Sequence, residues 1–211
     1  MADKKRVKRI AITMRVEEVA GNGELRDCLA QDWYDFMQYA LPEAHWVAIP
    51  NIGSKAEVRK FMDHWNIDGV ILSGGNDIGA IPKRDATERA VLSYCVSKVL
   101  PVFGVCRGLQ MIQVYFGGGL QKCAREIHVR RRHMVLFHDK RYAVNSYHAF
   151  GIKKNLLSPR LIPFALTSDG WVEGIQDRSS LIAAVQWHPE RGRPFRGYDR
   201  AIVRSVFGFG R

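Results

Sequence analysis

The chain has 211 residues, of which 46% are hydrophobic and 25% are charged, a composition typical of a globular protein with one substantial core. No apolar run approaches the ~18 residues that a transmembrane helix needs. The four cysteines show no C-x-x-C spacing, which argues against a zinc site and a disulfide framework. We therefore expect a single domain over residues 1–211 in the reducing cytoplasm.

The formal net charge of +11 raises nucleic acids, membrane surfaces and anionic small molecules as partners. No RNA-recognition, zinc-finger or helix-turn-helix pattern accompanies the basic residues, so we expect neither nucleic-acid nor membrane binding. A site for an anionic ligand and a plain solvated basic surface both stay open. The basic residues form three clusters: Lys4, Lys5, Arg6, Lys8 and Arg9; Arg125, Arg130, Arg131 and Arg132; and Arg191, Arg193, Arg196, Arg200 and Arg204.

The first half of the chain alternates between short apolar segments and amphipathic segments. This order predicts a parallel sheet covered by helices on both faces. Ser54, with Glu57 three residues later, matches the capping box at a helix start, and Asp85 is a candidate cap for the next helix. The predicted strands are 7–14, 44–49, 68–72 and 99–105, and the predicted helices are 24–40, 54–65, 85–98 and 109–116.

The second half follows another pattern. The segment 120–142 is rich in Arg and His and predicts short antiparallel strands and a loop. Three strand-like segments follow at 142–152, 164–175 and 180–190, and 197–210 predicts a closing helix. The fold class is therefore α/β: a mostly parallel twisted sheet flanked by helices, with a small antiparallel addition in the second half.

Cys106 stands between the buried strand and the following helix, within the sequence G-V-C-R-G. Gly104 and Gly108 permit a sharp strand-to-helix turn and a close approach of the two elements. Such a turn presents the thiol at the carboxyl edge of the sheet and at a helix N-terminus, where the dipole favours the thiolate. We predict that Cys106 is a nucleophile; a buried structural cysteine is the alternative.

A thiolate nucleophile needs a base and a group that orients the base. A strand ends at His188, and Pro189 disfavours a helical conformation for it. On an extended chain Glu190 points to the same side as His188 and can hold its imidazole. The prediction is a triad of Cys106, His188 and Glu190, against the alternative of a simple turn after an edge strand.

An oxyanion hole requires two donors. The backbone N–H of Arg107 follows the nucleophile, and the glycine pair Gly74-Gly75 ends a strand and brings bare backbone to the same edge. The alternative is a tight turn without substrate contact. We expect Gly75 and Arg107 to donate.

Other polar residues are candidates for substrate binding. Gln110 lies one helical turn after Cys106 and either faces the site or is solvated. His148 is a rival base without a carboxylate two residues later, so His188 is favoured. His128, His133 and His138 lack a ligand set of recognised spacing, so no metal site is predicted. The predicted substrate-binding residues are Gly74, Asn76, Gln110, Ser146, Tyr147 and His148.

Four motifs together resemble the class I glutamine amidotransferase-like superfamily, and most of all its γ-glutamyl hydrolase branch: I-L-S-G-G-N-D, G-V-C-R-G-L-Q, V-N-S-Y-H and V-Q-W-H-P-E. The resemblance extends from about Arg9 to Phe207. The chain is shorter than typical γ-glutamyl-γ-aminobutyrate hydrolases, and its S-G-G-N-D loop differs from theirs. The stretches R-D-C-L-A-Q-D-W-Y-D-F and A-I-P-N look more like compact members associated with surface-polysaccharide synthesis.

The resemblance implies a flavodoxin-like fold and a Cys106, His188, Glu190 triad, with oxyanion donors at Gly75 and Arg107. It implies hydrolysis of a γ-glutamyl amide through a thioester, without metal or organic cofactor. Candidate substrates are γ-glutamyl-CDP-amidate and γ-glutamyl-γ-aminobutyrate. The Arg107 side chain is expected to meet an acidic leaving group.

Two other functions stay open. A glutaminase subunit that delivers ammonia to a synthase partner would use identical chemistry. A non-catalytic binding or regulatory protein could keep the same fold. A homodimer is equally open, because no patterned interface is visible in the sequence.

Overall fold

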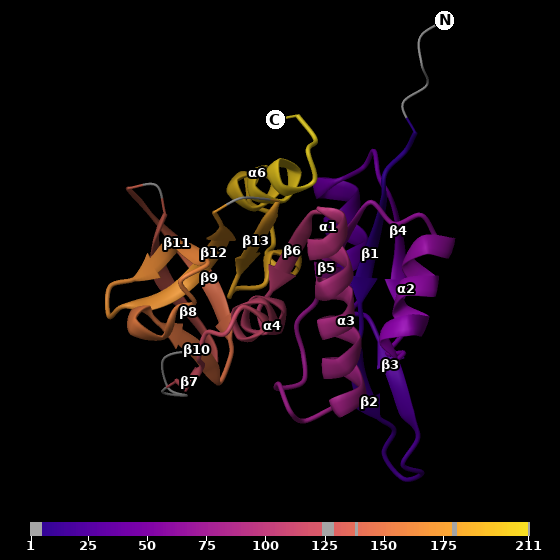
Figure 1. The fold of residues 1–211 in the computed structure, drawn as a ribbon. Helices are drawn as coiled ribbons and strands as arrows, with labels where there is room; N and C mark the ends of the chain where they lie inside the picture. The colour runs from indigo at the N-terminus through magenta and orange to yellow at the C-terminus, as the bar shows by residue number, and fades with distance from the viewer. Residues whose placement is uncertain (1–5, 124–128, 138, 179–180, 211) are drawn as a thin grey trace, which may run out of the picture.

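The computed structural model describes residues 6–123, 129–137, 139–178 and 181–210. Its centre is a large mixed sheet (Figure 1), in which the first five strands in spatial order are parallel and the rest are antiparallel. In spatial order the strands are β4 (His45–Ile49), β1 (Arg9–Thr13), β5 (Gly69–Leu72), β6 (Val102–Val105), β13 (Ile182–Val185), β12 (Trp171–Asp177), β11 (Leu161–Thr167), β8 (Val129–Phe137) and β9 (Lys140–Tyr147).

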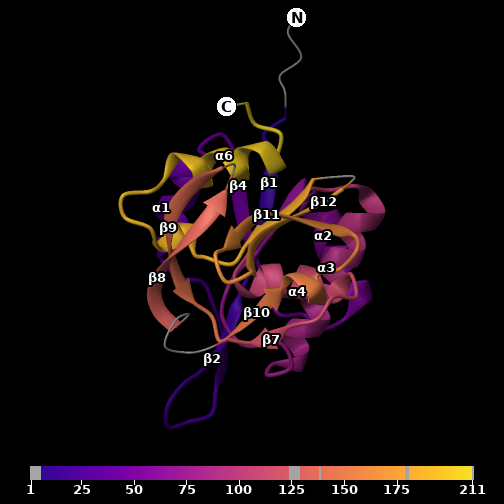
Figure 2. The same cartoon turned by 90° about the vertical axis from the view of Figure 1, so that its left-hand side faces the viewer.

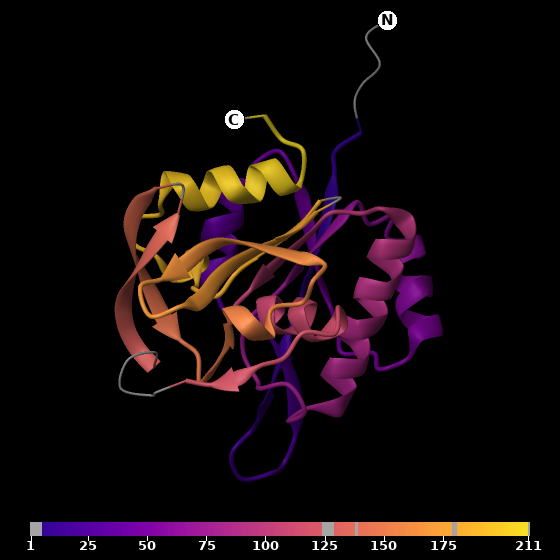
Figure 3. The ribbon, with the colours of Figure 1, turned by 60° about the vertical axis from the view of Figure 1, so that its left-hand side comes forward.

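Helices cover both faces of the parallel part, as predicted (Figures 2 and 3). One face carries α1 (Asp32–Ala40) and α6 (Gly197–Val206), and the other carries α2 (Lys55–His64), α3 (Pro82–Lys98) and α4 (Arg107–Tyr115). The alternation of side chains along β1 explains this, because Ile10 and Ile12 belong to the first core and Ala11 to the second. Both cores are apolar, which fits strands that read as continuous hydrophobic runs.

The carboxyl ends of the parallel strands meet at one edge of the sheet. The loop after β5, the turn after β6 and the segment after β13 all begin there. Ligands of such sheets bind at this edge. The topology therefore brings Gly75, Cys106 and His188 to one place, although they are distant in sequence.

The predicted helix over 24–40 is wrong in its first part. Residues Leu25–Cys28 form β3, which pairs with β2 (Arg15–Glu18) in a hairpin that extends beyond the sheet (Figure 1). Gly21 and Gly23 have positive φ angles and supply the turn. Leu25 is 63% exposed, so the buried stripe of α1 begins only at Trp33.

The other predicted elements agree with the structure to within a few residues, apart from the cap at Asp85 and the number of late strands. Ser54 caps α2 by accepting from the Glu57 N–H at 3.4 Å. Asp85 is not the cap of α3, which begins at Pro82; it accepts from the Gly79 N–H at 2.7 Å. The second half holds more strands than predicted, including β7 (Gln121–Lys122) and β10 (Phe150–Lys153).

None of the helices in the described ranges is both long and apolar enough to cross a membrane.

Candidate active site at the carboxyl edge of the sheet

Cys106 lies at the turn between β6 and α4 with a backbone φ of 52° and ψ of −103°. A positive φ costs a residue with a Cβ on the order of 1–3 kcal/mol and is found mainly where tight packing enforces it, often at functional sites. The packing is tight here: a Cβ at Gly108 would lie 2.1 Å from the Leu72 carbonyl oxygen. The two predicted elbow glycines, Gly104 and Gly108, therefore allow β5, β6 and α4 to approach closely.

His188 and Glu190 follow β13 and lie beside the thiol. The His188 ring forms a hydrogen bond with Cys106, and its Nδ1 is 2.7 Å from Glu190 Oε1. Glu190 lies in the short 3-10 helix η2 (Pro189–Arg191) rather than on an extended chain, yet it reaches the imidazole as predicted. Asn145, for which the sequence predicted no role, accepts from the His188 N–H and donates to the His188 carbonyl, both at 2.8 Å.

The charge state of His188 follows from its neighbours. Burial alone lowers the pKa of His188, but the negative charges of Glu190 and Cys106, and hydrogen bonds to both, outweigh burial and raise it to about 10. His188 is thus an imidazolium at neutral pH. A buried imidazolium between a carboxylate and a sulfur is an arrangement suited to nucleophilic chemistry.

Gln186 also touches the sulfur, a contact that the sequence motifs did not predict. Its side chain is fully buried, and Nε2 donates to Cys106 Sγ at 3.7 Å. A donor aimed at the sulfur stabilises negative charge there. The sequence did offer a signal for this contact. Gln186 lies two residues before His188 in a strand-like segment, and alternation puts the two side chains on the same side.

Two backbone donors lie near the elbow. Gly75 has φ +111°, a conformation that favours glycine, in the loop 73–76 after β5. A Cβ at Gly74 would lie 2.6 Å from His188 Cε1, so this loop lies against the imidazole. Within the described part of the chain, nothing accepts the N–H of Gly75 or of Arg107. The structure thus leaves both predicted oxyanion donors available.

Asn76 and Gln110 use their side chains to hold the backbone. Asn76 donates to the Val16 carbonyl at 2.8 Å and accepts from the Val16 N–H at 2.9 Å. Gln110 is 4% exposed and donates to the Phe150 carbonyl at 2.8 Å, so the alternative of a solvated Gln110 is wrong. Their contacts with a substrate stay predictions.

Side chains around Tyr147 alternate between buried and exposed, as the sequence predicted. Ser146 and His148 are buried, and Tyr147 is exposed with its ring edge-on to His188, 5.5 Å between centroids. His148 has no carboxylate two residues later, but one reaches it from another strand. Its Nε2 lies 3.4 Å from Glu173 Oε1, on β12.

His148 also has a thiol beside it, which creates a second Cys–His–Glu grouping. Cys123 Sγ lies 3.7 Å from His148 Nδ1. Burial, followed by the charge of Glu173, raises the pKa of the Cys123 thiol to about 12. This thiol stays protonated at neutral pH and is a poor nucleophile. Cys106 is therefore the better candidate.

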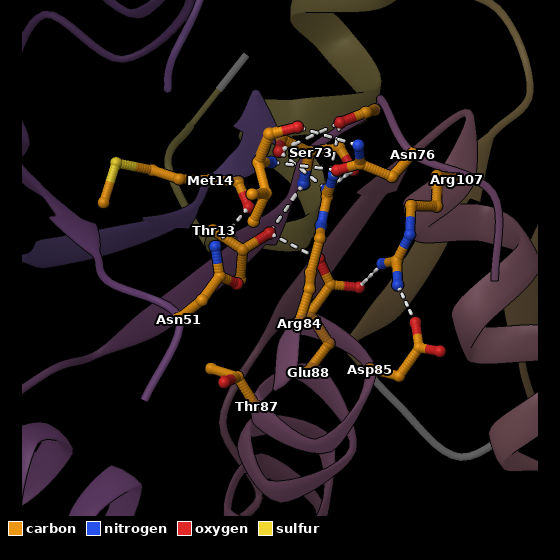
Figure 4. Close-up of polar contacts among 12 residues, drawn as sticks. Thr13, Met14, Asn51, Ser73, Asn76, Arg84, Asp85, Thr87, Glu88 and Arg107 are labelled. Atoms are coloured by element: carbon orange, nitrogen blue, oxygen red, sulfur yellow. Dashed lines mark hydrogen bonds and ion pairs between the residues drawn. The ribbon is translucent and has the colours of Figure 1, made fainter. Parts of the chain in front are cut away.

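Arg107 does not use its side chain as expected. The guanidinium is 1% exposed and forms ion pairs with Asp85 and Glu88 of α3 (Figure 4). It is directed into the protein, so the expectation that it meets an acidic leaving group is wrong. Its backbone N–H stays the predicted contribution of Arg107 to the site.

A cleft of about 680 Å³ adjoins His188 and Tyr147 and is strongly basic. Arg193 is partly neutralised by Asp32 and Asp35, both at 3.2 Å. Among the described residues that line the cleft, Asp199 is the one carboxylate. It is buried and accepts from Trp187. The lining arginines are Arg130, Arg131, Arg132, Arg191, Arg193 and Arg196.

His128 and His138, weighed as metal ligands, lie outside the described residues. Among the residues that are described, no three His, Cys, Asp or Glu side chains are grouped to hold a metal ion.

Comparison with known proteins identifies the family of this chain. The family model for glutamine amidotransferase class-I matches residues 36–196. Two solved structures share the fold: a glutamine amidotransferase from Thermotoga maritima (TM-score 0.65, 15% identity, 94% of this chain and 82% of that chain) and the glutaminase domain of Trypanosoma brucei CTPS with bound acivicin (TM-score 0.67, 15% identity, 97% and 96%). The chain belongs to the class I glutamine amidotransferase family.

Relatives within the family include γ-glutamyl hydrolases. The chain is 32% identical over 188 residues to the gamma-glutamyl-CDP-amidate hydrolase of Campylobacter jejuni, covering 86% of this chain and 90% of that protein. It is 29% identical over 199 residues to the gamma-glutamyl-gamma-aminobutyrate hydrolase PuuD of Escherichia coli, covering 81% and 72%. These relatives support a hydrolase of the glutamine amidotransferase type.

Proposed function

We propose that this protein hydrolyses a γ-glutamyl amide, with Cys106, His188 and Glu190 as its catalytic triad. The observation that carries the proposal is the buried His188, held 2.7 Å from Glu190 and hydrogen-bonded to a thiol on a strained elbow. A charged imidazole beside a thiol favours attack by the sulfur and keeps a proton ready for the leaving group.

In the first half of the reaction, Cys106 Sγ bonds to the δ-carbon of the γ-glutamyl group. The carbonyl oxygen takes the negative charge and accepts from the N–H groups of Gly75 and Arg107. His188 gives its proton to the amide nitrogen, the C–N bond breaks, and the leaving group departs. A γ-glutamyl thioester on Cys106 and a neutral His188 remain.

In the second half, neutral His188 takes a proton from water as the water oxygen attacks the thioester carbon. The same two N–H groups stabilise the oxyanion. The C–S bond then breaks, and glutamate leaves with the thiolate and the imidazolium restored. Glu190 keeps the imidazole oriented throughout and does not itself transfer a proton.

The basic cleft supports a leaving group that carries negative charge. Among the described residues, Arg130, Arg132 and Arg196 form no ion pair, so they can meet a phosphate without first losing a carboxylate partner. We therefore favour γ-glutamyl-CDP-amidate over γ-glutamyl-γ-aminobutyrate as the substrate. Replacing Arg130 and Arg196 by glutamine is expected to raise the KM for the nucleotide-linked amide about tenfold and leave the KM for glutamine unchanged.

The test of activity is glutamate release from three purified amides: glutamine, γ-glutamyl-γ-aminobutyrate and γ-glutamyl-CDP-amidate. C106A is expected to lower turnover by about 10⁴-fold or more. C123A is the matched control, because Cys123 also lies beside a histidine, and it should retain full activity. Turnover in C106A equal to that of the wild type would overturn the proposal, and inactivity of the wild type on all three amides would do the same.

A glutaminase subunit is the second candidate function. Some relatives are named putative glutamine amidotransferases, including one from Schizosaccharomyces pombe that is 34% identical over 59% of this chain. Glutamine hydrolysis that is negligible for the isolated protein and rises on adding a synthase would favour this function. Hydrolysis of another γ-glutamyl amide by the isolated protein favours the hydrolase.

A further inference from the structure

A network of buried charged side chains joins α3 to Ser73, Asn76 and Arg107 (Figure 4). Arg84, on α3, is 0% exposed and donates to the backbone carbonyls of Ser73 at 3.0 Å and Gly74 at 2.9 Å. It also donates to the Asn76 side chain at 3.1 Å. One arginine thus holds the whole loop that contains the first donor, Gly75.

Glu88 connects this arginine to the second donor. Its Oε1 accepts from Arg84 Nε and from Thr13 Oγ1, both at 3.0 Å, and its Oε2 accepts from Arg107. Asp85 completes the pairing of Arg107. Two guanidiniums and two carboxylates balance one another, as buried charges must. The network therefore joins both donor residues to one helix, α3.

We propose that Arg84 is a positioning residue for the oxyanion hole. In a trans peptide plane the C=O and the N–H point to opposite sides. The Gly74 carbonyl and the Gly75 N–H share one such plane, so the bond from Arg84 to this carbonyl directs the N–H away from α3. Gly74 itself packs against the imidazole, since a Cβ there would lie 2.6 Å from His188 Cε1.

The loop needs this restraint because its peptide joins two glycines. Glycine rotates into positive and negative φ with little cost, and Gly75 is exposed. A turned peptide would present a carbonyl oxygen to the substrate oxyanion in place of a donor. Glu88 accepts from Arg107 as well as from Arg84, so it restrains both donor residues. The distance between the two donors is therefore set by α3. This inference rests on the proposed function, since it assumes that an oxyanion forms there.

The test compares R84Q, R84K and R204Q. Arg204 is the matched control because it also binds a glutamate and backbone carbonyls, but from α6 and far from the loop. R84Q is expected to lower kcat about 10²–10³-fold, the effect of losing one oxyanion donor, with little change in KM. R84K keeps the charge but not the planar fork, and it should lie between R84Q and the wild type.

Alkylation of Cys106 by iodoacetamide separates positioning from general damage, because this displacement forms no oxyanion. The rate should be the same in R84Q, R84K and the wild type. A folded R84Q with wild-type kcat overturns the inference, and so does a fall in alkylation that parallels the fall in kcat. If R84Q does not fold, wild-type kcat in R84K overturns it. A wild type without turnover refutes the proposed function and this inference together.

Discussion

Replacing Glu190 by glutamine tests the electrostatic part of the mechanism without changing its shape. The amide oxygen of a glutamine can still accept from His188 Nδ1, which lies 2.7 Å from the carboxylate. The change removes only the negative charge. It therefore separates the orientation of the imidazole from the stabilisation of its positive charge.

The magnitude follows from the geometry. Two unit charges about 4 Å apart attract by about 4 kcal/mol at an effective dielectric constant of about 20. That energy is about a thousandfold in the protonation equilibrium of the imidazole. With the carboxylate gone, burial lowers the pKa of His188 from about 10 toward its ordinary 6.5 or below. A fall of about three in this pKa leaves roughly a tenth of His188 protonated at pH 8, so the proton for the leaving group is mostly absent and kcat/KM should fall by about 10–30-fold at this pH.

Two measurements check this prediction. The first is the pH profile of kcat/KM, whose alkaline limb should move to lower pH in E190Q. The second is urea unfolding: the stability that His188 contributes is fully present below pH 6.5 and is lost as the pH rises toward 10. This loss should be smaller in E190Q. Wild-type kcat/KM and an unshifted alkaline limb in folded E190Q would refute the reasoning.

Three further changes have defined outcomes. G108A places a Cβ 2.1 Å from a backbone oxygen of β5 and should destabilise the fold by about 3 kcal/mol, measured as a lower Tm; G197A, where a Cβ meets nothing within 4 Å, is the control. N145A removes two hydrogen bonds to the backbone of His188 and should lower kcat about tenfold with KM unchanged. Burial raises the pKa of Asp199 to about 7 from 3.8, so the fold loses stability as the pH rises from 4 to 7; D199N should flatten this dependence in urea unfolding, and an unchanged slope would contradict the assignment.

The sequence predicted those features that depend on short spacings. The elbow was predicted from one glycine on each side of Cys106, each two residues away. The pairing of His188 with Glu190 was predicted from their separation of two residues. The alternation of strands and helices then brought these segments to one edge of the sheet. Local signals and topology were sufficient for this part of the site.

The parts that were missed depend on long-range contacts. Leu25 and Cys28 continue the helical spacing of α1, but their partners are on β2, which local periodicity cannot show. Arg84 and Glu88 could be read as an ordinary exposed i, i+4 pair; only their burial and their contacts with distant loops give them a role. The pairing of His148 with a carboxylate likewise crosses from one strand to another.

The central claim is that Cys106 carries the γ-glutamyl group during turnover. Acid quenching during hydrolysis of a γ-glutamyl amide, followed by peptide mapping by mass spectrometry, tests it directly. We predict a glutamyl adduct on the peptide that contains Cys106, and its removal by hydroxylamine. An adduct on Cys123 or on another residue, with Cys106 unmodified during turnover, would contradict the claim.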